Sequence, residues 1–284
     1  MGAAAFFGSY MVIILLLDTT YCREQADADN LLVWAAHSGA KGMENLKITC
    51  HENKDCTVHS MASFKKGEIV FSVPRNLTLE APDGPEGDLD LNGQVQLKLL
   101  TEQVYGDKSP WEPYIRMLPN ETSLTLSMSR EDLGYLNGTQ SQTDFELHRD
   151  VQEQQAKDLC VWARQHDAAL PPGTEYHHFH LDACLWAVSM MKSRAFQVQS
   201  PKVDTLLKPT FIPIMDMMNH RSWAYEGGQD CTQTVNGVLH CAYKVPKDVA
   251  VGDELVITYG KGHASHLYPS HCHTFLTSVL PQQC

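Results

Sequence analysis

The chain changes its hydrophobic periodicity twice, and this change constrains the fold more than any other feature of the sequence. Residues 46–80 contain short apolar runs such as "LKITC" and "GEIVFSVP", which are typical of β-strands. From about residue 94 to residue 196 apolar residues recur at helical spacing, and from about residue 207 the strand pattern returns. This order predicts one β-domain that carries a helical insertion, so the two β parts must pack together across it.

Local signals place several elements within this order. "NLLVWAAHSGA" predicts a short helix within residues 23–45, and "SRED" predicts a helix start with Ser129 as N-cap and Asp132 near N3. "EAPDGPEGDLDLNG" is typical of turns and loops. Asn236 and Gly237 form the predicted turn of a hairpin in "CTQTVNGVLHCAYKV", and "TFIPIMD" and "ELVITYG" are further predicted strands.

The first 22 residues predict a signal peptide. The apolar run from Ala3 to Leu17 has the length of a signal h-region, although no Lys or Arg precedes it. An uncleaved anchor is the alternative, but roughly 15 apolar residues are short for a membrane span of about 20. We therefore expect a signal peptide at 1–22, one domain at 23–284, and no stable membrane span after cleavage.

Three glycosylation sequons agree with secretion. Asn76-Leu-Thr, Asn120-Glu-Thr and Asn137-Gly-Thr each match the acceptor pattern of secreted proteins. In a chain with a signal-like start, they predict a glycoprotein of the secretory pathway, either in the lumen of the endoplasmic reticulum or secreted.

The cysteine count points the same way. Removal of the leader removes Cys22 from a total of nine, and the remaining even number predicts disulfides in an oxidising compartment. Connectivity cannot be read from the sequence, but Cys50 with Cys56 and Cys231 with Cys241 are local candidates. Free buried thiols are the alternative.

Charge and histidine content limit the partners. The net charge of −12 argues against a nucleic-acid surface, because phosphate binding needs a basic patch. His266, His271 and His273 form a candidate metal cluster, but they lack the Cys-x-x-Cys spacing of strong metal sites, and a solvated rim is the favoured interpretation. We expect no metal site.

Residues 211–220, "FIPIMDMMNH", end an apolar run in Asp216, Asn219 and His220. These residue types are common turn formers. Taken alone, they indicate a strand end whose side chains anchor a turn through hydrogen bonds.

With its neighbours, this fragment resembles a known family. "WAVSMMKSRAF" before it, the hairpin after it and "VPKDVAVGDELVITYG" resemble the second half of SET-domain methyltransferases, in the branch of the Rubisco large-subunit lysine methyltransferase and the actin-histidine methyltransferase. "SPWEPYIRMLP" and "REDLGYLNGT" resemble the helical insertion of that branch, and "FKKGEIVFSVPRNLTLE" its early strand pair. The resemblance covers roughly residues 33–275. It implies an α+β SET fold: short antiparallel sheets with a C-terminal pseudoknot and an inserted helical subdomain at about 94–196.

The resemblance also implies an activity. SET enzymes transfer a methyl group from S-adenosylmethionine (SAM) to a side-chain nitrogen, so a protein substrate with a Lys or His target is expected. Tyr259 matches the channel tyrosine that orients the target nitrogen and is the expected catalytic residue. The expected cofactor-binding residues are Arg194, Asp216, Met217, Asn219 and His220.

Three features favour a different function: the lost glycine turn, the altered tail after Tyr259 and the cysteines that can form disulfides. Active relatives carry a Gly-x-Gly turn that allows close approach of the cofactor, and here Asp55, Cys56 and Thr57 stand at the matching positions. The segment after Tyr259, "YGKGHASHLYPSHCHTF", differs from the usual tail. The further helical domain that grips the substrate protein in relatives is not expected here, so the resemblance does not indicate which substrate is chosen. The alternative to an enzyme is a secreted SET-like pseudoenzyme with a binding or scaffold role. No sequence feature indicates an oligomeric state.

Overall fold

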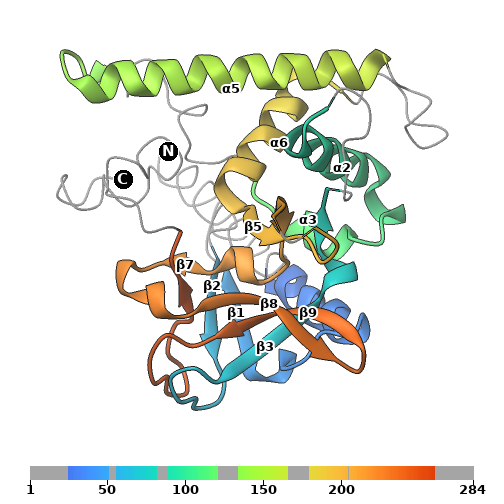
Figure 1. Cartoon of the computed structure of the whole chain (residues 1–284), viewed down its shortest axis with the longest axis vertical. Coiled ribbons are helices and arrows are strands. Elements are labelled where there is room, and N and C mark those ends of the chain that lie inside the picture. Colours follow the sequence, from blue (N-terminus) through green and yellow to red (C-terminus); the bar gives the residue numbers. More distant parts are fainter. Residues whose placement is uncertain are drawn as a thin grey trace, which may run out of the picture.

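A computed structural model describes residues 25–50, 56–81, 89–120, 134–165, 179–203 and 205–259, with only the main chain described for residues 225 and 226. Figure 1 shows the strands gathered in one half of the molecule and the long helices in the other. The predicted signal peptide, Asp55, the helix start at Ser129, the C-terminal histidines and the tail of the predicted pseudoknot lie outside the described residues.

A hairpin opens the β part. It follows a helix over residues 25–37, as predicted, and the short 3-10 helix η1 (Met43–Asn45). Strands β1 (Leu46–Cys50) and β2 (Cys56–Ser60) pair antiparallel, with Cys50 opposite Cys56. Alternate residues of both strands are buried, so one face of the hairpin packs on the core.

Strands from either side of the helical segment pair directly. β3 (Ile69–Pro74) pairs antiparallel with β9 (Val238–Lys244), which also pairs with β8 (Gly228–Val235). Asn236 and Gly237 join β8 to β9 with φ of 52° and 80°, so the predicted hairpin turn is confirmed.

A second three-stranded sheet supports the segment that follows it. Its order is β4 (Leu79–Glu80), β6 (Leu207–Phe211) and β5 (Phe196–Gln199), all antiparallel. The strand predicted over "TFIPIMD" was too long, because β6 ends at Phe211. Pro213 has no N–H for a sheet ladder, and Ile214 has φ of 73°, which turns the chain out of the extended conformation.

Among the strands that the structure describes, one pair is parallel. After β6 the chain forms the 3-10 helix η7 (Met215–Met217) and the two-residue strand β7 (Asn219–His220), which pairs in parallel with β10 (Val256–Ile257). The predicted sheets are therefore antiparallel except at this pair. The predicted strand "ELVITYG" contributes only these two residues of β10.

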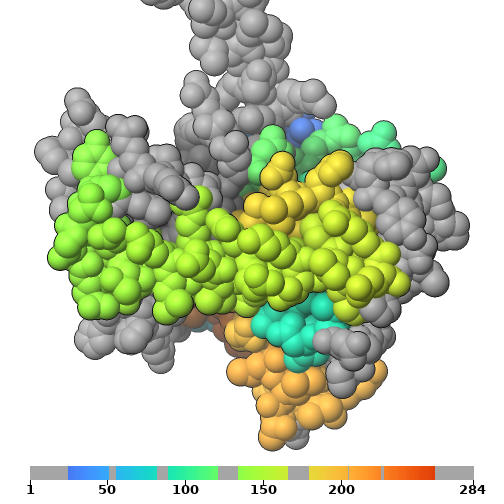
Figure 2. Space-filling model, turned by 90° about the horizontal axis from the view of Figure 1, so that it is seen from above, coloured from blue at the N-terminus to red at the C-terminus, as the bar shows by residue number. Residues whose placement is uncertain are grey.

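Apart from the helix over residues 25–37, which lies beside the strands, the α-helices stack above them (Figure 1). They are α2 (Leu91–Tyr105), α3 (Glu112–Met117), α5 (Gln140–Gln165) and α6 (Leu181–Arg194), and α6 contacts both α2 and α5. Seen from above, α5 runs across much of the width of the molecule (Figure 2). The side chain of Asp90 accepts a hydrogen bond from Gly93 N at 2.8 Å and caps α2, which begins before residue 94. None of the described helices combines the length and apolar character that a membrane crossing requires.

The short 3-10 helices η3, η4 and η8 complete the described elements; their bounds are Arg75–Leu77, Gly106–Lys108 and Ser222–Glu226. A buried ion network ties β4 to β6. Arg75 and Lys208 contact the carboxylate of Glu80 at 2.9 and 3.3 Å. The side chains of Arg75 and Lys208 are only 9% and 2% exposed, so both cations meet the Glu80 carboxylate away from solvent.

Three disulfides cross-link the described chain. Cys50–Cys56 and Cys231–Cys241 are the two local pairs that the sequence indicated, and Cys160–Cys184 joins α5 to α6. The alternative of free buried thiols is therefore wrong for these six residues. The Cys160–Cys184 disulfide was not predicted, because a separation of 24 residues gives no local signal.

Candidate functional site

The carboxyl group of Asp216 lies in an enclosed position between three segments. Its side chain is 0% exposed, and its Oδ2 accepts a hydrogen bond from the Tyr114 hydroxyl of α3 at 2.7 Å. Arg194, at the end of α6, donates from Nη1 to the main-chain oxygen of Asp216 at 2.9 Å and lies 4.0 Å from Oδ2. Burial raises the pKa of Asp216 to about 6, against the opposing effects of Arg194 and Tyr114.

A second carboxylate orients the next residue of the site. The Asn219 side-chain nitrogen donates to Glu254 Oε1 at 2.7 Å, and Arg221 contacts Glu254 Oε2 at 3.2 Å. Glu254 is thus held from both sides, and the Asn219 amide is fixed in one orientation.

His220 and Tyr259 form the other end of the site. Tyr259 N–H donates to His220 Nδ1 at 3.0 Å, which requires that this ring nitrogen carry no proton. Burial, with a smaller effect of Arg221, lowers the pKa of His220, which agrees with a neutral ring. The Tyr259 hydroxyl donates to the Met218 main-chain oxygen at 3.0 Å. The ring centroids of His220 and Tyr259 lie 5.2 Å apart.

The six residues expected at the site therefore fall on neighbouring elements. Met217 is buried beside Asp216 in η7, Asn219 and His220 form β7, and Tyr259 follows β10. Hydrogen bonds connect Arg194 to Asp216 and His220 to Tyr259. Their proximity is a property of the fold, and their roles remain predictions.

Two residues of this site were missed by sequence reasoning. Tyr114 belongs to "SPWEPYIRMLP" and Glu254 to "GDEL", and both motifs were recognised without a role for these side chains. Tyr114 and Asp216 are 102 positions apart, so no local spacing reveals their hydrogen bond.

The hairpin that departs from the Gly-x-Gly pattern borders this site. β2 contacts η7, and the Val58 main-chain oxygen accepts from Leu255 N at 2.8 Å, beside Glu254. The Thr57 hydroxyl lies 3.3 Å from the Thr49 main-chain oxygen and 2.9 Å from His59 Nε2. Its hydrogen bonds are therefore made within the β1–β2 hairpin. The Cys50–Cys56 disulfide closes this hairpin at its loop end.

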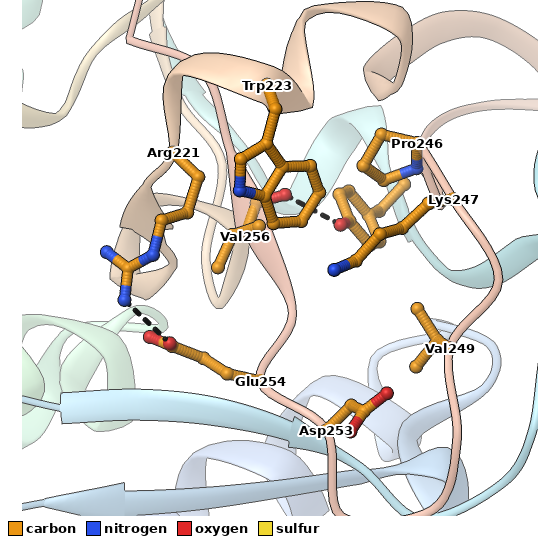
Figure 3. A pocket seen from close by; sticks show the side chains of 9 residues that line it. Arg221, Trp223, Pro246, Lys247, Val249, Asp253, Glu254 and Val256 are labelled. Carbon is orange, nitrogen blue, oxygen red and sulfur yellow. Dashed lines mark hydrogen bonds and ion pairs between the residues drawn. The ribbon is translucent and has the colours of Figure 1, made fainter.

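A cavity of about 220 Å³ borders the site. Arg221 and Glu254 line it, and Glu254 also accepts the hydrogen bond from Asn219. Figure 3 shows the indole of Trp223 on one wall, with Lys247 Nζ directed toward it and the Arg221–Glu254 ion pair at the rim. Lys247 Nζ is 4.0 Å from the Trp223 ring centroid, a cation–π contact. Among the described residues, no group of His, Cys, Asp and Glu is arranged to hold a metal ion.

Comparison with known proteins gives relatives by sequence and by structure. No protein-family model matches the chain. Actin-histidine N-methyltransferases of Homo sapiens and Mus musculus are 26% and 27% identical to it, over 81% of this chain and 39% of each relative. The chain thus spans about two fifths of the length of these curated relatives.

Two solved structures share the fold. A crystal structure of the SET domain of LSMT bound to lysine and AdoHcy superposes with a TM-score of 0.68 and 20% identity, over 86% of this chain and 56% of that one. A structure of Rubisco LSMT bound to AdoMet gives 0.66 and 21%, over 86% and 55%. The likeness confirms the fold class predicted from the sequence.

Proposed function

We propose that this chain, which is a SET-domain protein of the branch of the Rubisco large-subunit lysine methyltransferase and the actin-histidine methyltransferases, is a SAM-dependent protein N-methyltransferase that acts on a Lys or His side chain. The observation that carries the proposal is the meeting of Arg194, Asp216, His220 and Tyr259 around η7 and β7. These residues come from three separate parts of the chain, and an unrelated turn would not require all of them.

The chemistry of the site suits a cationic cofactor. SAM, when bound, supplies a methyl group on a positively charged sulfonium. Tyr114 and Arg194 lie at Oδ2 of Asp216, whereas Oδ1 is a buried acceptor with no hydrogen-bond partner among the described residues, and a negative charge at this oxygen favours a further cation nearby. Arg194, Asp216, Met217, Asn219 and His220 are the residues that we expect to hold the cofactor.

The protein contributes mainly alignment. Neutral His220 accepts the Tyr259 N–H and fixes the main chain of Tyr259, while Met218 fixes its hydroxyl. A hydroxyl held in this way orients the target nitrogen, whose lone pair must be free of its proton before it attacks. Exclusion of water by the buried η7 turn strengthens these polar contacts.

We also propose that the chain works in the secretory pathway, as a glycoprotein with a signal peptide at 1–22 and the predicted helical insertion at about 94–196. Three disulfides support an oxidising compartment. The side chains of Asn76, Asn120 and Asn137 are all exposed, as glycosylation requires. The acidic net charge supports a protein substrate rather than a nucleic acid.

The direct test is SAM binding by the full chain secreted from cultured eukaryotic cells. Titration calorimetry should give a saturable heat with SAM, and transfer of a labelled methyl group to a protein of the secretory lumen should follow. The matched control is Trp223→Ala, which changes the neighbouring cavity and leaves the η7 contacts in place. Absence of both heat and thermal shift at millimolar SAM refutes the proposal.

A pseudoenzyme is the second candidate, and one observation favours it. The hairpin beside η7 is closed by Cys50–Cys56 and carries Thr57 where relatives have glycine, so side chains occupy a place that the cofactor approaches in that family. This candidate predicts a folded, glycosylated chain without SAM affinity. Methyl transfer that appears in an Asp55→Gly/Thr57→Gly variant would identify a decayed enzyme.

A further inference from the structure

Tyr114 is a fully buried residue of the helical layer whose hydroxyl reaches the turn that carries Asp216. It lies on α3, its exposed fraction is 0%, and its oxygen is 2.7 Å from Asp216 Oδ2. No sequence motif or relative named above assigns it a role. Its distance from Asp216 along the chain means that the contact exists only when α3 is packed against η7.

The Asp216 carboxyl depends on this contact. Within the described residues, the Tyr114 hydroxyl is its only side-chain hydrogen bond, because Oδ1 has no partner and Arg194 lies 4.0 Å from Oδ2. Arg194 of α6 and Tyr114 of α3 are the side chains that act on this carboxyl electrostatically. Both stabilise its ionised form, while burial opposes ionisation.

The position of Asp216 transmits this effect to the rest of the site. Asp216 lies two residues before Met218, whose main-chain oxygen receives the Tyr259 hydroxyl. The preceding Ile214 has φ of 73°, an uncommon conformation for a β-branched residue that only surrounding contacts maintain. A carboxylate that leaves its place would therefore release both the turn and the acceptor of Tyr259.

We propose that Tyr114 is a positioning residue for SAM: its hydroxyl holds the Asp216 carboxylate at the cofactor turn. SAM affinity then depends on Tyr114, which acts through Asp216 and does not itself contact the cofactor. The inference rests on the proposed function. It assigns to α3 of the helical layer a part in cofactor binding.

The test is Tyr114→Phe in the full secreted chain, with SAM affinity measured by calorimetry from pH 5.5 to 8. The wild-type affinity should fall toward low pH with a midpoint near the Asp216 pKa of about 6, because the neutral acid no longer attracts the cation. Loss of a hydrogen bond that favours the ionised form should move this midpoint up by about one pH unit. The variant should then bind at least fivefold more weakly than wild type at pH 6, where the change in ionisation alone gives about fivefold, and should remain weaker at pH 8, because displacement of the carboxylate acts at any pH.

Two further variants separate positioning from stability. Tyr243→Phe removes another buried hydroxyl, which donates to the Val256 main-chain oxygen at 2.7 Å, and should leave the midpoint unchanged. Asp216→Asn keeps an acceptor for Tyr114 but removes the titrating group, so the dependence of SAM affinity on pH should flatten. The inference requires a flat profile in this variant whether or not Tyr114→Phe folds, so an unchanged midpoint overturns it without the Tyr114 variant.

The outcomes are distinguishable. SAM binding by wild type and Tyr114→Phe with the same pH midpoint overturns the inference and leaves the proposed function intact. An Asp216→Asn variant that keeps the wild-type midpoint does the same. Wild-type chain that binds no SAM at any pH overturns both.

Discussion

Replacement of Cys160 and Cys184 together by Ala removes the disulfide that joins α5 to α6. Both residues are buried, at 3% and 0% exposure, and Ala fits an apolar site without leaving a free thiol. The closed loop has a sequence separation of 24, the longest of the three described disulfides. Its removal should therefore release more unfolded-state entropy than removal of either of the other two.

The chain-entropy relation gives the magnitude. A separation of 24 corresponds to about 3.4 kcal/mol of stability at 25 °C. The separation of 6 in Cys50–Cys56 corresponds to about 2.2 kcal/mol. For a chain of this size, 1 kcal/mol shifts the melting temperature by about 2–4 °C, so the α5–α6 variant should melt about 7–14 °C lower than wild type.

Thermal unfolding followed by circular dichroism measures the shift. Cys50→Ala/Cys56→Ala is the matched control and should melt between wild type and the α5–α6 variant. Peptide mapping without reduction should first show all three bonds in the wild type. A control that melts at or below the α5–α6 variant, or an α5–α6 variant within about 2 °C of wild type, would show that loop closure does not govern these bonds.

Four more predictions concern single side chains. Glu80→Ala removes the carboxylate that pairs with buried Arg75 and contacts Lys208 and should cost about 3 kcal/mol in urea unfolding, whereas Asp248→Ala, which breaks an exposed pair with Lys65, should leave the midpoint unchanged. Tyr259→Phe should lower the methyl-transfer rate constant about a hundredfold in single-turnover assays, and an equal loss in SAM affinity would contradict a role in orienting the target. Because burial raises the pKa of Asp216 from 3.8 to about 6, the folded chain binds this proton more tightly than the unfolded chain. Its contribution therefore lowers stability as the pH rises from about 4 to about 6, and Asp216→Asn should flatten that part of the unfolding curve. Asn76→Gln should remove one endoglycosidase-sensitive step in the mass of the secreted chain, and an unchanged mass would show that this sequon is unused.

Periodicity predicted the helices and strands better than it predicted their ends. α5 and the β8–β9 hairpin follow from spacing and from the Asn236–Gly237 turn, which depend only on neighbouring residues. The end of β6 could not be predicted in this way, because the apolar run continues through Ile212 and Ile214 while the main chain has already turned. Burial alone makes a strand and a buried turn look alike in sequence.

The residues of the site were recognised as fragments, and their connections were not. Resemblance identified Asp216, Asn219 and His220, while Tyr114 and Glu254 entered only when their hydrogen bonds to this turn were seen. A hydrogen bond has its full effect where water is excluded, and exclusion of water is a property of packing.

By itself the sequence determined the order of β, helical and β segments and the hairpin turn, because each depends on spacings of a few residues, while the residues expected at β7 followed from resemblance. Only the tertiary structure decided that Cys160 of α5 pairs with Cys184 of α6 and which hydroxyl reaches the carboxyl of Asp216. These contacts join positions 24 and 102 residues apart, and their geometry exists only after the helices have packed against η7 and one another.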